Sequence, residues 1–140
     1  MSLIHIRQVA VQFRRAIERC RTQLPIQSRD FPHGACGDAV LLLAKFLQEN
    51  GHTGFWYILR MREDCSHAWL QRGDLIVDIT ADQFPDQRKS VIVALNPGWH
   101  RTFERDLDEK EQVADFEQYD PRTVAEMRHA YRLCISRLER

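Results

Sequence analysis

Three residues in the middle of the chain have side chains that could together support thiol chemistry: Cys36, His67 and Asp78. A cysteine thiolate is a nucleophile, an imidazole can take up and return its proton, and a carboxylate can fix the orientation of the imidazole. Alone, each has a plainer interpretation, because cysteines are commonly buried and inert, and many histidines and aspartates are structural. What the three can do together depends on the elements that hold them.

The stretch after Cys36 predicts a helix that begins at this cysteine. Its apolar stripe consists of Val40, Leu43, Ala44 and Leu47. The helix is expected to stop at Asn50-Gly51, where glycine accepts the left-handed conformation. The positive end of the helix dipole stabilises a thiolate, and so does a neighbouring imidazolium. The sequence thereby supplies the first of two conditions for a reactive Cys36 thiol.

Two β-rich runs, at residues 66–71 and 75–80, predict a hairpin that carries His67 and Asp78. If Arg72-Gly73 forms a two-residue turn, His67 stands directly opposite Asp78. Directly opposed side chains point to the same face, with Cβ atoms roughly 4.5–5.5 Å apart. The hairpin therefore predicts a hydrogen bond between imidazole and carboxylate, which a register slip of one residue would abolish.

These motifs resemble those of the papain-like superfamily of cysteine hydrolases, and most closely its transglutaminase-like branch. The matching stretches are Gly34-Ala35-Cys36-Gly37-Asp38-Ala39, His67-Ala68-Trp69 and Val77-Asp78-Ile79-Thr80, within residues 31–84. The resemblance implies an α+β core in which the nucleophile helix packs on an antiparallel sheet. It also implies thiol chemistry on amides. Trp69 is expected in the core beside the site.

A tetrahedral intermediate of acyl transfer needs hydrogen-bond donors for its oxyanion. The backbone N–H of Cys36, at the start of the predicted helix, is one expected donor. The candidates for a second donor are Gln27, His33 and Gln83. Asp82 is an alternative to Asp78 as the orienting carboxylate, with a less favourable place in the hairpin.

The remaining pattern predicts one α+β domain spanning residues 1–140, with helices flanking the core at both ends. A helix is expected over residues 6–20, ending before Leu24-Pro25, and another begins at Asp120-Pro121. Strands are expected at residues 55–61, 66–71, 75–80 and 91–95. Residues 101–118 are heavily charged and weakly periodic, which favours a solvated face or a partner surface.

The other cysteines divide into two groups. Cys20 and Cys134 fall on apolar helix stripes and are predicted core residues. Cys65 shares the predicted strand face of His67, so it could be a redox partner of Cys36 or a zinc ligand with Cys36 and His67. The spacing lacks an evident fourth ligand and does not match a structural zinc site, so no metal or cofactor is expected. Apart from His33 as a candidate oxyanion donor, no role is assigned to the other histidines, which are His5, His33, His52, His100 and His129.

The composition limits the partners. Lys and Arg number 20 and so do Asp and Glu, which gives a formal net charge of zero and no electrostatic footprint for nucleic acid. No apolar run approaches the ~20 residues of a membrane helix, and the N-terminal residues lack the layout of a secretory signal. Four cysteines without a C-x-x-C pair favour a reduced protein in the cytoplasm.

The sequence therefore predicts a thiol-dependent amide hydrolase or acyltransferase of the peptidase, deamidase or transglutaminase type. Cys36 would be the nucleophile, His67 the general base and acid, and Asp78 the residue that orients His67. The reaction would pass through a thioester on a protein or peptide substrate. The alternative is a non-catalytic protein-binding module that retains the same fold.

Overall fold

The computed structural model describes residues 2–24, 36–106 and 112–138, and these residues form an α+β structure. Their three α-helices are α1 (Leu3–Cys20), α2 (Cys36–Glu49) and α3 (Pro121–Ser136). Helix α1 begins after Ser2, whose hydroxyl accepts from the backbone N–H of His5. Helix α3 begins after Asp120, whose carboxylate accepts from the backbone N–H of Thr123. Such caps satisfy N–H groups that have no partner inside the helix.

The strands form one antiparallel sheet in the order β4-β3-β2-β1-β5, and β6 also pairs with β1. The strands are β1 (Trp56–Arg62), β2 (Cys65–Arg72), β3 (Leu75–Asp78), β4 (Ile92–Leu95), β5 (Arg105–Asp106) and β6 (Gln112–Val113). Short 3-10 segments follow β3, β4 and β6: these are η3 (Ala81–Gln83), η4 (Gly98–Thr102) and η5 (Phe116–Gln118). The charged region at residues 101–118 therefore contributes two short edge strands where it is described.

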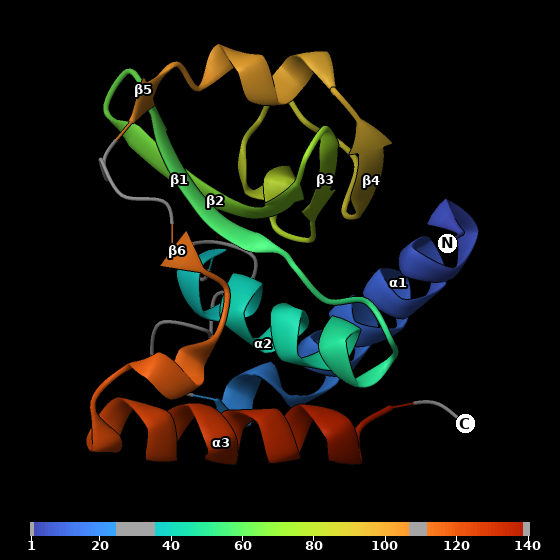
Figure 1. Cartoon of the computed structure of the whole chain (residues 1–140), viewed down its shortest axis with the longest axis vertical. Helices are drawn as coiled ribbons and strands as arrows, with labels where there is room; N and C mark the ends of the chain where they lie inside the picture. The colour runs from blue at the N-terminus through green and yellow to red at the C-terminus, as the bar shows by residue number, and fades with distance from the viewer. Residues whose placement is uncertain (1, 25–35, 107–111, 139–140) are drawn as a thin grey trace.

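The sheet separates two apolar clusters of different size. Figure 1 shows the three helices on one side of the sheet and the η4 segment on the other. Ala68 and Leu70 of β2 belong to the large core formed with the helices. Trp69, between them, belongs to a smaller cluster on the other face with Phe84 and Phe103. This division follows from the alternation of side chains along a strand, and it decides on which face of β2 the candidate histidine lies.

The predicted hairpin forms, but its turn differs from the prediction. The turn consists of Gly73 and Asp74, with Gly73 at a φ of 59°, and not of Arg72-Gly73. The described pairs of β2 and β3 run from Arg72↔Leu75 to Leu70↔Val77. Continued by one step, this register places Asp78 opposite Trp69, so His67 is a diagonal neighbour of Asp78. A shift of two positions preserves the face of every side chain, whereas a shift of one would have reversed it.

The end of β3 also differs from the prediction. Strand β3 ends at Asp78, whereas the apolar pattern predicts strand up to Thr80. Thr80 instead precedes η3, and its backbone N–H bonds the carboxylate of Asp78. None of the described helices combines the length and the apolar character needed to cross a membrane.

Candidate active site

The His67 ring and the Asp78 carboxylate are in direct contact inside the protein. Nε2 of His67 lies 2.6 Å from Oδ2 of Asp78, and both side chains are fully buried. The hydrogen bond that the hairpin predicts therefore exists, although the two residues meet diagonally. Because Asp78 takes Nε2, the ring presents Nδ1 on its opposite side.

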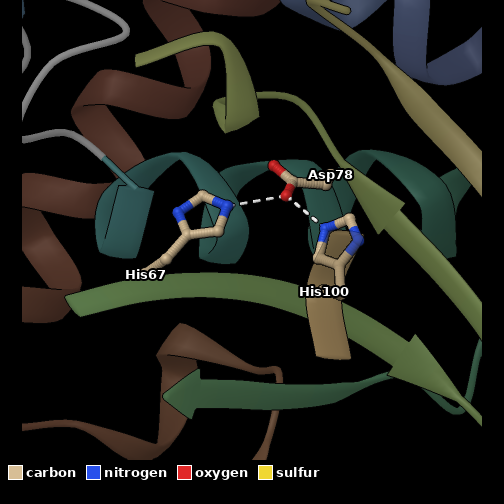
Figure 2. Close-up of side chains that lie close together, drawn as sticks. All are labelled: His67, Asp78 and His100. Carbon is tan, nitrogen blue, oxygen red and sulfur yellow. Dashed lines mark hydrogen bonds and ion pairs between the residues drawn. The ribbon is translucent and has the colours of Figure 1, made fainter. Parts of the chain in front are cut away.

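A second imidazole reaches the same carboxylate oxygen. Nε2 of His100, on η4, lies 2.7 Å from Oδ2 of Asp78, and His100 is also buried. Figure 2 shows both rings turning one nitrogen toward this oxygen. The other oxygen, Oδ1, accepts from the backbone N–H of Thr80 at 2.9 Å. Asp78 thus receives three hydrogen bonds, as expected of an ionised carboxylate removed from water.

These contacts determine the ionisation of Asp78. Burial by itself would raise the pKa of this carboxyl. The charge and hydrogen bond of His67, together with those of His100, outweigh burial and lower the pKa to about 2. The group therefore stays ionised throughout the neutral pH range.

Aromatic rings enclose the His67 imidazole. The ring centroid lies 5.6 Å from Trp69, 5.1 Å from Phe84 and 5.5 Å from Phe103. The prediction that Trp69 is a core residue beside the site is confirmed, since it is 3% exposed. These walls exclude water, which strengthens the electrostatic interaction between His67 and Asp78.

A side-chain amide faces the Nδ1 side of the His67 ring. Nε2 of Gln83 lies 3.2 Å from Nδ1 of His67. Gln83 ends η3, and the preceding residue, Asp82, is held in a two-pronged ion pair with Arg14 at 2.7 and 3.0 Å. Arg14 also donates to the carbonyl of Ile79. Asp82 therefore fixes the path of this segment, while Asp78 is the carboxylate that orients His67.

The sheet opens beside His67. Strand β2 continues to Cys65 on the β1 side, but its described pairs with β3 stop at Leu70↔Val77. Beyond that point the chain after Asp78 turns away into η3. On this side of the ring, Gln83 of η3 faces Nδ1 of His67.

Helix α2 begins at Cys36 and packs against β2. A hydroxyl on β1 lies close to the start of this helix, since a Cβ atom added at Gly37 would be 3.2 Å from the Tyr57 oxygen. In Figure 2 the α2 ribbon begins on the side of His67 to which Nδ1 points. The side chain of Cys36 lies outside the described part of the structure. Helix α2 packs on the face of β2 opposite to His67, because Ala68 and Leu70, which alternate with His67 and Trp69 along the strand, belong to the core formed with the helices.

The distances within the cluster of His67, Asp78 and His100 match hydrogen bonds better than the spacing of ligands around a metal ion. Their ligand atoms lie within 4.8 Å of one another, so the three could be considered as metal ligands. Two ligands of one ion at about 2.1 Å and a tetrahedral angle would stand roughly 3.4 Å apart. The contacts of 2.6 and 2.7 Å to Oδ2 are much shorter and match charge-assisted hydrogen bonds.

The remaining predicted residues are placed as follows. Cys20 and Cys134 are fully buried, which confirms them as core residues, and their sulfur atoms are 3.8 Å apart. Cys65 is exposed, and it joins no group of three potential metal ligands among residues 2–24, 36–106 and 112–138. Gln27 and His33 lie outside the described residues. Of the three candidates for a second oxyanion donor, Gln83 is the one placed next to His67.

His100 is the residue of this cluster that sequence reasoning missed. It follows β4 in a short irregular segment, and it reaches Asp78 across 22 positions of sequence. Strand pairing predicts contacts between strands, and no comparable rule places a side chain from a 3-10 turn. Its position beside Trp99, in a turn that opens with Pro97 and Gly98, was the one available signal of a buried segment.

Comparison of the chain with protein-family models, with curated proteins and with solved structures finds no match.

Proposed function

We propose that this protein is a cysteine-dependent amide hydrolase or acyltransferase with a papain-like or transglutaminase-like core. Cys36 is the nucleophile, His67 the general base and acid, and Asp78 the residue that orients His67. The observation that carries the proposal is the buried contact of 2.6 Å between His67 Nε2 and Asp78 Oδ2. It orients the imidazole so that Nδ1 points to the side on which helix α2 begins in Figure 2, and Cys36 is the first residue of this helix.

The reaction proceeds in two stages. The Cys36 thiolate attacks the carbonyl carbon of an amide, and the resulting oxyanion accepts from the Cys36 backbone N–H and from the Gln83 amide. As the C–N bond breaks, the leaving amine or ammonia takes a proton from Nδ1 of His67 and leaves a thioester. Water or a second amine then gives a proton to His67 and attacks the thioester carbon, and the thiolate is released.

The proposed substrates are proteins or peptides, and the proposed compartment is the cytoplasm. Neutral net charge supports a substrate other than nucleic acid. The small number of cysteines, four without a C-x-x-C pair, supports a reducing compartment.

The pH dependence of iodoacetamide labelling at Cys36 tests this function. A thiolate paired with imidazolium reacts well below pH 8, whereas an ordinary thiol follows a pKa of about 8.5. The His67→Ala variant is expected to lose the reactivity at low pH. Cys65, which is exposed, is labelled in the same sample and serves as an internal reference.

A second measurement separates catalysis from a binding module of the same fold. Reaction with p-nitrophenyl acetate is expected to release nitrophenol in a burst and to leave an acetyl group on Cys36. The Cys36→Ser variant is the matched control and should give no burst. Equal labelling of Cys36 and Cys65 at all pH values, without an acetyl adduct, would establish the non-catalytic alternative.

A further inference from the structure

The Asp78 carboxylate has one more buried partner than a triad of cysteine, histidine and aspartate requires. His67 and His100 both direct Nε2 at the same oxygen, at 2.6 and 2.7 Å. Thr80 already fixes the other oxygen. Because both rings share Oδ2, a change at His100 acts on the very atom that orients His67.

The hydrogen positions on His100 follow from its surroundings. Oδ2 of Asp78 can only accept, so Nε2 of His100 carries the hydrogen. Within the described part of the chain, Nδ1 of His100 is buried and has no hydrogen-bond partner. When the ring is neutral it is therefore the Nε2–H tautomer, because a lone pair at the buried Nδ1 costs less than an N–H there without an acceptor.

The ring of His100 is also fixed mechanically. It packs edge-on against Trp69 at 4.8 Å and against Trp99 at 4.9 Å, with interplanar angles of 72° and 89°. His100 is 2% exposed. A donor held this tightly costs little further entropy when it bonds the carboxylate, which is the property of a preorganised support.

We propose that His100 is a positioning residue of the thiol site, which holds Oδ2 of Asp78 in place to orient His67. This inference rests on the proposed function. Among the described residues, the charged or titratable groups that face Asp78 are His67 from β2 and His100 from η4. Arg14 of α1 bonds the Ile79 carbonyl and is paired with Asp82. His100 is thus the support that can be removed without touching the reacting atoms.

Three substitutions separate a positioning role from simple core packing. His100→Phe fills the ring volume without a donor. His100→Gln keeps an N–H near the position of Nε2, whereas His100→Asn keeps one near Nδ1, which points away from Asp78 (Figure 2). A packing role predicts that both amides are equally poor substitutes, while a positioning role predicts rescue by glutamine alone.

The readouts are the pH titration of the Asp78 carboxyl carbon by NMR and the rate of Cys36 acetylation by p-nitrophenyl acetate. In His100→Phe and His100→Asn, the titration midpoint is expected to rise by about one pH unit, a tenfold change in the proton-binding constant. Acetylation at neutral pH is expected to fall about tenfold in these two variants, because Oδ2 of Asp78 is no longer held in place to orient His67, and to return in His100→Gln.

The two proposals fail in different ways. A wild-type Cys36 that gains no acetyl group would overturn the proposed function, whatever the variants do. A reactive wild type whose Phe and Asn variants keep the wild-type titration and acetylation would overturn the role of His100 alone. Equal losses in the Gln and Asn variants would likewise reject positioning and assign His100 to packing.

Discussion

The side-chain amide of Gln83 lies 3.2 Å from Nδ1 of His67, on the side of the ring away from Asp78. Each nitrogen of the His67 ring thus has a polar neighbour, which is the Asp78 carboxylate at Nε2 and the Gln83 amide at Nδ1. An amide offers a donor on one arm and an acceptor on the other. In the proposed reaction it can therefore bond the neutral ring or turn its N–H toward an oxyanion.

The first prediction concerns this amide. In Gln83→Ala, acetylation of Cys36 by p-nitrophenyl acetate should fall about 100-fold, the usual effect of losing one oxyanion donor. Alkylation of Cys36 by iodoacetamide forms no oxyanion and should change little. Gln87→Ala is the control, since Gln87 lies in the next turn and accepts from the backbone of Lys89. Parallel losses in both reactions would mean that Gln83 only supports the ring.

The second prediction concerns acid stability. The pKa of Asp78 in the folded protein, about 2, lies below its ordinary value of 3.8. Ionised Asp78 therefore adds about 2 kcal/mol to the free energy of unfolding above pH 4, and this contribution is lost as the pH falls through 2. Urea unfolding measured at several pH values should show that loss in the wild type and lack it in Asp78→Asn.

The matched control for Asp78 is Asp86. Its carboxylate is exposed and bonds Arg62, and the hydrogen bond to Arg62 lowers its pKa. Asp86→Asn should keep the acid-dependent loss of stability, because Asp78 is intact. If Asp78→Asn lost stability between pH 4 and 2 as the wild type does, the buried carboxylate would not be its source.

The third prediction concerns Arg14, which is 6% exposed although it lies on a helix. It bonds both oxygens of Asp82 and the carbonyls of Ile79 and Ser90. Arg14→Ala should lower the free energy of unfolding by about 3 kcal/mol, because it leaves Asp82 without its cation. Arg15→Ala removes the neighbouring exposed arginine and should stay within about 0.5 kcal/mol of the wild type.

The Arg14→Ala substitution should also lower the reactivity of the candidate site. Arg14 and Asp82 hold the segment that carries Gln83, so Arg14→Ala is expected to reduce Cys36 acetylation under conditions in which the variant is still folded. Circular dichroism of the same sample checks folding. Full acetylation in a folded Arg14→Ala protein would show that Gln83 keeps its place without the ion pair.

The fourth prediction concerns the thiols that join α1 to α3. The hydrogen bond between the two thiols lowers the pKa of Cys20, while the same bond and burial raise the pKa of Cys134. With their sulfur atoms 3.8 Å apart, the two should form a disulfide when diamide takes up the two thiol hydrogens. The residues are 114 positions apart, so the bond should stabilise the protein by up to about 4 kcal/mol.

Peptide mapping by mass spectrometry and thermal unfolding check this outcome. The background is Cys65→Ser, because Cys65 is exposed and could join two molecules. Cys20→Ala in that background should show no rise in melting temperature after oxidation. Oxidation that instead captured Cys36, or that lowered the melting temperature, would contradict the predicted pairing.

Local patterns determined most of the secondary structure and one contact of the site. The start of α2 at Cys36, the caps at Asp120 and the hairpin of β2 and β3 all follow from interactions within a few residues. The contact of His67 with Asp78 was predictable for the same reason, because strand alternation fixes the face of each side chain. The inference holds although the predicted turn was wrong, because the register differs from the predicted one by an even number of residues.

Tertiary structure decided what surrounds that contact. It brought His100 from η4 to the oxygen that His67 already holds, and it brought Arg14 from α1 to the segment that carries Gln83. No helix or strand periodicity predicts these two contacts, because each joins a residue of an irregular segment to an element that is distant in the sequence. A buried carboxylate must collect donors from wherever the packed chain presents them. The sequence predicted the contact of Asp78 with His67, and only the packed structure revealed the second contact, with His100.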